Sequence, residues 1–207
     1  HALMDAGLLH QDVKTIMGEG LEAYTCEPVL QMGQLQWKGV VSHSKDDTVL
    51  VDHHRAYRKT GGLTLLQGNL GRAIVKTSAL SDEKFILKAP CKVFESQQEL
   101  SVAFDAGELD QDFIAVVRHQ GAKANGMPEL HQLTPLLSVI QQRGFKVALV
   151  TDGRMSGASG AVPAAIHLYP EALDGGVIGK IENGDEILFN CATGELNLLV
   201  DEAVLAR

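Results

Sequence analysis

Two short apolar segments constrain what this chain can fold into more than any other feature of its sequence. Residues 112–118 (DFIAVVR) and 146–150 (KVALV) have the length and the apolar, β-branched content of buried strands. Between them, apolar side chains recur at helical spacing at Leu133, Leu136, Leu137 and Ile140. The order of strand, helix and strand predicts a βαβ-like unit.

Turn residues divide the rest of the chain after residue 60 into short elements. The helix between the two apolar strands is expected to begin at Thr134 as its cap, with Pro135 in the first turn, and to end at Gly144. A second helix is predicted over 96–106 and the start of a third over 201–207. Further short strands are predicted at 63–67, 73–77, 92–95, 175–181, 186–190 and 196–200.

These elements favour a mixed α/β fold over a doubly wound parallel sheet. The strands are short, and several are joined by turns such as Asn183-Gly184-Asp185 and Thr193-Gly194, which is typical of antiparallel hairpins. We therefore predict a β-barrel-like core with flanking helices, of the swivelling β/β/α type.

The first 60 residues are less regular, and residues 38–60 are polar. We interpret 1–35 as the end of a preceding amino-terminal domain, 36–60 as a linker, and 61–207 as the carboxy-terminal domain. The chain opens HALMDAGLLHQD, without Met and without the basic and apolar regions of a signal peptide. We interpret this start as a cut inside a longer protein.

Composition excludes several classes of partner. The 207 residues carry a formal net charge of −8 and scattered Lys and Arg, which disfavours nucleic-acid binding. No apolar run approaches the 18 residues of a membrane span, so no membrane association is expected. The three cysteines, Cys26, Cys91 and Cys191, are far apart, so we expect reduced thiols in a cytoplasmic protein, and no iron–sulfur cluster held by these three alone.

The most informative loop is 151–160 (TDGRMSGASG), which follows an apolar strand. Polar groups at the end of a buried strand are a usual place for a reactive group, although a plain glycine-rich turn has the same composition. The chain has no phosphate-binding loop motif, because its one Gly-Lys pair, Gly179-Lys180, is followed by Ile181 and not by Ser or Thr. Ser156 does not lie in a nucleophile elbow, because Arg154 and Ala158 stand where that motif requires glycine.

A second polar loop, 118–129 (RHQGAKANGMPE), also follows an apolar strand. It ends in Glu129, which could interact with a helix dipole or could offer oxygen to Mg²⁺. Both loops leave the carboxyl ends of strands that could be neighbours, so they could share one cleft. A third segment, Gly68-Asn69-Leu70-Gly71-Arg72, has by itself the composition of an ordinary turn.

Together these segments resemble the dihydroxy-acid and phosphogluconate dehydratase family. The resemblance rests on Gly68-Asn69-Leu70, on R-x-x-G followed by G-M-P-E, and on T-D-G-R-x-S-G followed by H-x-x-P-E-A, and it covers about residues 61–203. Within the family the chain looks most like the phosphogluconate branch, because Arg118-His119-Gln120-Gly121 and the stretch MSGASG at 155–160 fit that branch.

The resemblance implies a hydro-lyase that eliminates water from 6-phosphogluconate to give 2-keto-3-deoxy-6-phosphogluconate, in the Entner–Doudoroff pathway. It implies that Ser156 is the catalytic base and Glu129 a Mg²⁺ ligand. It also implies an iron–sulfur cluster whose cysteines lie in an amino-terminal domain of the same enzyme, outside this chain. We expect the fragment alone to be inactive, and the full-length enzyme to form a homodimer.

Arg154 and Arg118 are candidates for binding the carboxylate or phosphate of the sugar-acid substrate, because guanidinium binds both groups well. Each could equally pair with an acidic side chain of the protein. We also predict Asp152 and Asn69, from the same motifs, as substrate-binding residues. Two alternatives stay open for the whole chain: a dihydroxy-acid or other sugar-acid dehydratase, and a substrate-binding lid module without chemistry.

Overall fold

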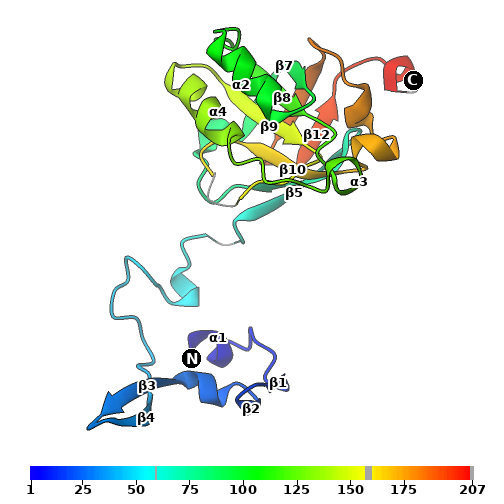
Figure 1. Ribbon diagram of the computed structural model, residues 1–207. Helices are drawn as coiled ribbons and strands as arrows, with labels where there is room; N and C mark the ends of the chain where they lie inside the picture. The colour runs from blue at the N-terminus through cyan, green and yellow to red at the C-terminus, as the bar shows by residue number, and fades with distance from the viewer. Residues whose placement is uncertain (59, 157–159, 206–207) are drawn as a thin grey trace. The chain divides into compact units, whose positions relative to one another are not determined.

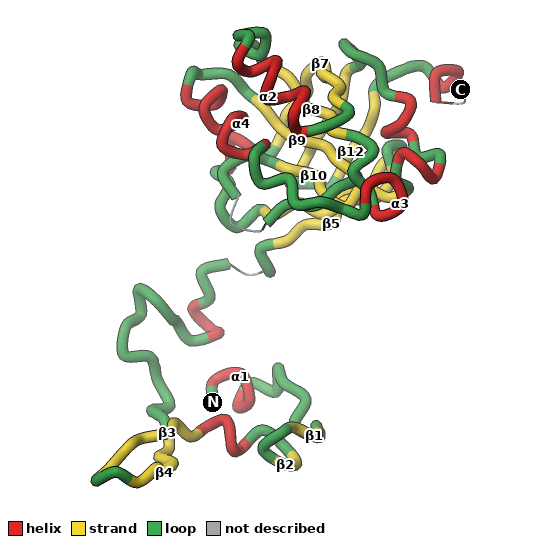
Figure 2. Tube along the Cα trace, viewed as in Figure 1, coloured by secondary structure: helices red, strands yellow, loops and turns green. Residues whose placement is uncertain are grey.

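In the computed structural model, which describes residues 1–58, 60–156 and 160–205, the chain divides into two units, His1–Thr60 and Gly61–Arg207. Strands of the second unit form one closed barrel in the order β10-β6-β5-β12-β11-β7-β8-β9 (Figures 1 and 2). These strands are β5 (Leu63–Gly68), β6 (Gly71–Lys76), β7 (Ile86–Phe94), β8 (Phe113–Val117), β9 (Val147–Thr151), β10 (Ala164–Tyr169), β11 (Glu186–Asn190) and β12 (Glu195–Leu198).

The barrel mixes two kinds of strand pairing. β7, β8, β9 and β10 pair in parallel with one another, and β12 pairs in parallel with β5. The remaining neighbours, including the β5–β6 and β11–β12 hairpins, are antiparallel. The predicted fold class, a mixed α/β fold with a barrel-like core and flanking helices, is confirmed.

Side chains of β8 alternate between two hydrophobic clusters. Ile114 and Val116 belong to the cluster that fills the barrel, together with side chains from β5, β6, β7, β9 and β11. The intervening side chains pack outside the barrel against α2 (Gln97–Asp105) and α4 (Leu133–Gln142), which lie over β8 and β9 in Figure 1. Burial on both faces explains why this strand is apolar at every position.

Several elements differ from the sequence-based expectations. Helix α4 begins at Leu133, with Gln132 as its cap and no side-chain capping bond, so the expected Thr134 cap is wrong. Residues 175–181 were expected as a strand but contain the 3-10 helix η5 (Val177–Lys180). Strand β10 was not expected, because its buried alanines give no alternating pattern.

Short helices complete the second unit: η3 (Asp82–Lys84), α3 (Ala122–Asn125), η4 (Ala172–Asp174) and α5 (Glu202–Leu205). The helix predicted over 96–106 corresponds to α2, and the structure shows that Ser96 caps it, because the Ser96 side chain accepts a hydrogen bond from the Glu99 N–H at 3.2 Å. None of the helices formed by the described residues has the length and hydrophobicity needed to span a bilayer.

The first unit contains two small hairpins and short helices. The strands are β1 (Lys14–Thr15), β2 (Gly18–Glu19), β3 (Cys26–Gln31) and β4 (Gln34–Gly39), and the helices are α1 (Ala2–Asp5), η1 (Glu22–Thr25) and η2 (His53–Arg55). The predicted start of a linker at residue 36 therefore falls inside β4. None of the described side chains of this unit is buried, so by themselves they enclose no hydrophobic core.

Candidate functional site

The two polar loops lie against each other beyond the carboxyl ends of β8 and β9. Glu129 connects them: its Oε1 accepts a hydrogen bond from the Ser156 N–H at 2.7 Å, and its Oε2 accepts one from Arg154 Nη1 at 2.8 Å. The backbones of Glu129 and Arg154 also form an isolated parallel bridge. One carboxylate therefore holds the Ser156 backbone and the Arg154 guanidinium in a single group.

Two members of this group are open to solvent. Ser156 is an exposed residue, and the Arg154 side chain is 48% exposed although its Nε also donates to the Met127 carbonyl at 2.9 Å. An exposed guanidinium beside a serine can meet an anionic ligand. Gly157, Ala158 and Ser159, part of the motif identified in the sequence, lie outside the described residues.

Asp152 occupies a different environment, because the residue is only 1% exposed. Its Oδ1 accepts from the Gln120 N–H at 2.8 Å, and its Oδ2 accepts from the N–H groups of His119 at 3.2 Å and Ala172 at 3.0 Å. These bonds join three separate segments through one buried carboxylate. The arrangement supports a role for Asp152 in fixing the loops; substrate binding by Asp152 stays a prediction.

Arg118 and Asn69 likewise use their polar atoms within the fold. Arg118 contacts Glu95 through Nε at 2.7 Å and Nη2 at 2.6 Å, and its Nη1 donates to two carbonyl groups near η5. Asn69 exchanges two hydrogen bonds with the backbone of Leu198, at 2.7 and 2.8 Å, which joins the β5–β6 turn to β12. Substrate binding by these two residues also stays a prediction, and the contacts favour structural roles.

Sequence reasoning missed Glu171, a buried acid of the H-x-x-P-E-A motif. Its carboxylate accepts hydrogen bonds from the Lys123 N–H at 3.0 and 3.2 Å, at the start of α3. A Cβ on Gly121 would lie 2.0 Å from Glu171 Oε2, so this position of the R-x-x-G motif requires glycine. The two motifs therefore share one structural contact, which their separation of about fifty residues hides.

The cysteines of this chain do not form a cluster site. Cys91 and Cys191 are buried in the barrel cluster, and burial raises the pKa of their thiols to about 11 and about 12. Cys91 also donates a hydrogen bond to the Glu182 carbonyl at 3.2 Å. Ligation requires ionised thiolates brought together, so these residues do not fit an iron–sulfur cluster.

For a hard cation the second unit offers the Glu129 carboxylate, with both oxygens already in use. Where the chain is described, one group of three potential ligands lies close enough together for a metal: Asp52, His53 and His54, in the first unit. Glu129 could supply one oxygen ligand to Mg²⁺ and still accept both hydrogen bonds, because each carboxylate oxygen has a second lone pair.

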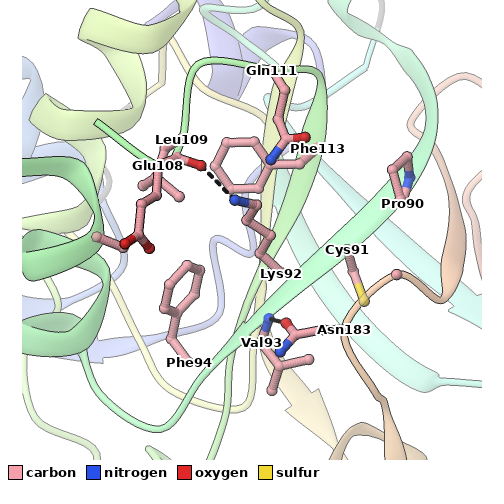
Figure 3. A pocket seen from close by; sticks show the side chains of 12 residues that line it. Pro90, Cys91, Lys92, Val93, Phe94, Glu108, Leu109, Gln111, Phe113 and Asn183 are labelled. Atoms are coloured by element: carbon pink, nitrogen blue, oxygen red, sulfur yellow. Dashed lines mark hydrogen bonds between the residues drawn. The ribbon is translucent and has the colours of Figure 1, made fainter. Parts of the chain in front are cut away.

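A separate cavity of about 460 Å³ lies along β7 and below α2, and none of its lining residues comes from the two polar loops. Figure 3 shows Lys92 extending across it toward the Glu108 carbonyl, to which its Nζ donates. The cavity is thus distinct from the group around Glu129.

Comparison with known proteins agrees with the motifs of the two loops. Residues 48–207 match the family model described as dihydroxy-acid/6-phosphogluconate dehydratase C-terminal. The chain is 55% identical over 204 residues to phosphogluconate dehydratase of Escherichia coli K12, covering 99% of this chain and 34% of that protein. The corresponding protein of Pseudomonas aeruginosa is 53% identical over 201 residues, covering 97% and 33%.

A more distant relative, dihydroxy-acid dehydratase 2 of Corynebacterium efficiens, is 35% identical over 208 residues, covering 99% of this chain and 34% of that protein. The chain thus spans about a third of the length of the curated relatives it matches. The family model covers most of the chain, and the matched residues include the whole barrel and both polar loops. Together with the identity of 55% to a relative, this match shows that the chain belongs to the dihydroxy-acid/6-phosphogluconate dehydratase family.

Proposed function

We propose that this chain is the carboxy-terminal catalytic part of a hydro-lyase that removes water from 6-phosphogluconate to give 2-keto-3-deoxy-6-phosphogluconate. The observation that carries the proposal is the Glu129 carboxylate, which joins the G-M-P-E motif to Arg154 and Ser156 of the T-D-G-R-x-S-G motif. The names and high identity of the phosphogluconate dehydratases from two bacteria support this substrate.

In the proposed reaction, Ser156 Oγ removes the proton from C2 of the substrate, and the C3–O bond breaks as the hydroxyl group leaves. The hydroxyl takes up a proton to become water, and the resulting enol becomes a ketone at C2. A serine hydroxyl acts as a base near neutral pH only where nearby positive charge stabilises its ionised form. Mg²⁺ held in part by Glu129 would supply such charge when bound.

Arg154 is the proposed contact for the substrate carboxylate or phosphate. Its guanidinium is half exposed and is held at one edge by the Met127 carbonyl and by Glu129. These contacts fix its orientation, which lowers the entropy lost when an anion binds.

The remaining parts of the site are proposed to come from an amino-terminal domain of the same enzyme. Relatives about three times as long as this chain support a second domain. The cysteines of this chain do not fit a cluster, so an iron–sulfur cluster would have its ligands in that domain. We also propose a cytoplasmic enzyme that forms a homodimer.

Replacement of Ser156 by alanine in the full-length enzyme tests the assignment. Ser156→Ala should abolish dehydration of 6-phosphogluconate while the protein keeps its fold and its visible cluster spectrum. Ser81→Ala is a matched control, because Ser81 is an exposed serine of the same unit that bonds to Glu83. Near-normal turnover by Ser156→Ala would rule out Ser156 as the base.

A substrate panel tests the choice of substrate. Wild-type enzyme should prefer 6-phosphogluconate to gluconate and to a short branched dihydroxy acid, and preference for an unphosphorylated acid would contradict the proposal. Titration of the 207-residue chain with 6-phosphogluconate, followed by NMR, tests the alternative of a binding module. Tight binding to the chain combined with an active Ser156→Ala enzyme would favour that alternative.

A further inference from the structure

The backbone of His119 adopts a conformation that side-chain-bearing residues rarely adopt. Its φ is +58°, in the left-handed region, where a residue other than glycine carries a conformational cost. The buried Asp152 carboxylate fixes this conformation by accepting hydrogen bonds from the N–H groups of His119 and Gln120. Such backbone strain is concentrated at functional sites, where it orients a particular side chain.

The imidazole of His119 is oriented by the side chain of Glu95, which is itself held by Arg118. Its Nδ1 lies 2.7 Å from Oε2 of Glu95, whose Oε1 bonds to the guanidinium of Arg118. The bond from Arg118 is the main reason that the pKa of Glu95 lies below its ordinary value, so this carboxyl group is ionised at neutral pH. A carboxylate only accepts hydrogen bonds. Nδ1 of His119 therefore carries a proton, and Nε2 is left as the group that can exchange one.

The position of His119 places it at the same edge of the barrel as the proposed catalytic loop. Glu95, Arg118 and Asp152 each directly follow the last residue of β7, β8 or β9, three neighbouring parallel strands. The His119 side chain is 43% exposed. It is therefore an accessible imidazole on a rigid support, beside the strand end from which the Ser156 loop departs.

Other acid–base side chains of the two loops are less suited to proton exchange. Asp152 is buried and accepts three N–H groups, and both oxygens of Glu129 are hydrogen-bonded. Within the described chain, His131 and His167 are exposed and have no side-chain hydrogen bond that orients them. His119 is thus the loop imidazole that a carboxylate orients.

We propose that His119 is a second catalytic residue, which delivers the proton to C3 of the enol, with Glu95 and Arg118 as its positioning residues. This inference rests on the proposed dehydration, which needs a proton at C3 after water has left. The proton moves from Nε2 of the imidazolium to C3, the C2–C3 double bond supplies the electron pair, and the enol hydroxyl loses its proton to solvent as the C2 carbonyl forms. His119 then regains a proton from solvent.

The test is dehydration of 6-phosphogluconate in D₂O by the full-length enzyme, with the deuterium at C3 of the product located by NMR. Wild type should place deuterium in one of the two C3 positions. His119→Gly should lower kcat by about 100-fold, the usual contribution of a positioned acid, with little change in KM, and should scatter deuterium over both positions. Glycine favours the φ of this position, so this variant should fold.

Two more variants separate catalysis from a structural role. Added imidazole should partly restore turnover to His119→Gly, which it would not do if the side chain only stabilised the loop. Glu95→Gln should lower kcat by less than His119→Gly, because glutamine can still accept from Nδ1–H but does not stabilise the imidazolium. His131→Asn is the matched control, because it removes an exposed imidazole that no carboxylate orients, and it should leave kcat and labelling unchanged.

The possible results distinguish the two proposals. Absence of any product with wild type would refute the dehydration of 6-phosphogluconate, and this inference with it. His119→Gly could instead label one C3 position only, at a normal rate or at a reduced rate that imidazole does not restore. That result would refute the role of His119 and leave the proposed dehydration standing.

Discussion

Asp152 provides the sharpest test of how the two loops are held together, because one buried carboxylate accepts three backbone N–H groups. Asp152→Ala leaves all three without their acceptor, and each unsatisfied buried group costs about 1–3 kcal/mol. Water can reach two of the three, which are only partly buried, so the expected loss is about 4 kcal/mol of unfolding free energy.

Asp152→Asn has the same shape but replaces one oxygen by an NH₂ group. With the remaining oxygen in the Oδ2 position, the bonds from His119 and Ala172 survive and the amide NH₂ faces the Gln120 N–H. One lost bond and one donor–donor contact cost about 2 kcal/mol. For a protein of this size, the melting temperature should fall by roughly 4–8 °C for asparagine and 8–16 °C for alanine.

Circular dichroism melts of the 207-residue chain measure this effect. The fluorescence of Trp37 is unsuitable, because this single tryptophan lies in β4 of the first unit. Asp110→Asn is the matched control: Asp110 pairs with Arg143 at 2.6 Å but is 46% exposed, so its loss should cost at most about 1 kcal/mol. Equal melting temperatures for Asp152→Asn and Asp110→Asn would refute the reasoning.

Three further predictions follow from other contacts. Asn69→Ala should lower the unfolding free energy by about 2 kcal/mol in urea melts, because two backbone groups of β12 lose their partner; no loss would contradict the structural role of Asn69. The bond from Arg118 lowers the pKa of Glu95, so wild type should lose more stability than Glu95→Gln as pH falls below 4.5, and equal acid melts would contradict this. Burial raises the thiol pKa of Cys91 and Cys191, so a thiol reagent at pH 8 should modify only Cys26 in the folded chain and all three cysteines in denaturant. Modification of three cysteines in the folded chain would show that the barrel opens.

Local pattern was sufficient for much of the fold. The apolar run of β8 and the helical apolar spacing of α4 and α2 are set by residues close in the chain. The hairpin between β11 and β12 follows from its turn residues in the same way. The strand in the 164–169 region escaped this reasoning, because its alanines are buried by distant strands and leave no local signal.

By itself the sequence determined many of the elements after residue 60, the barrel-like fold class and the two motif loops, because turn chemistry, hydrophobic period and a specific motif are all local properties. Only the tertiary structure decided what the polar groups of those loops contact. Arg118 and Asp152 look like ligand-binding residues in a linear sequence, yet their partners, Glu95 and the Ala172 N–H, lie about twenty residues away and come from other strand ends. A hydrogen bond depends on where the chain returns in space, and in this protein the closure of the barrel brings those strand ends together.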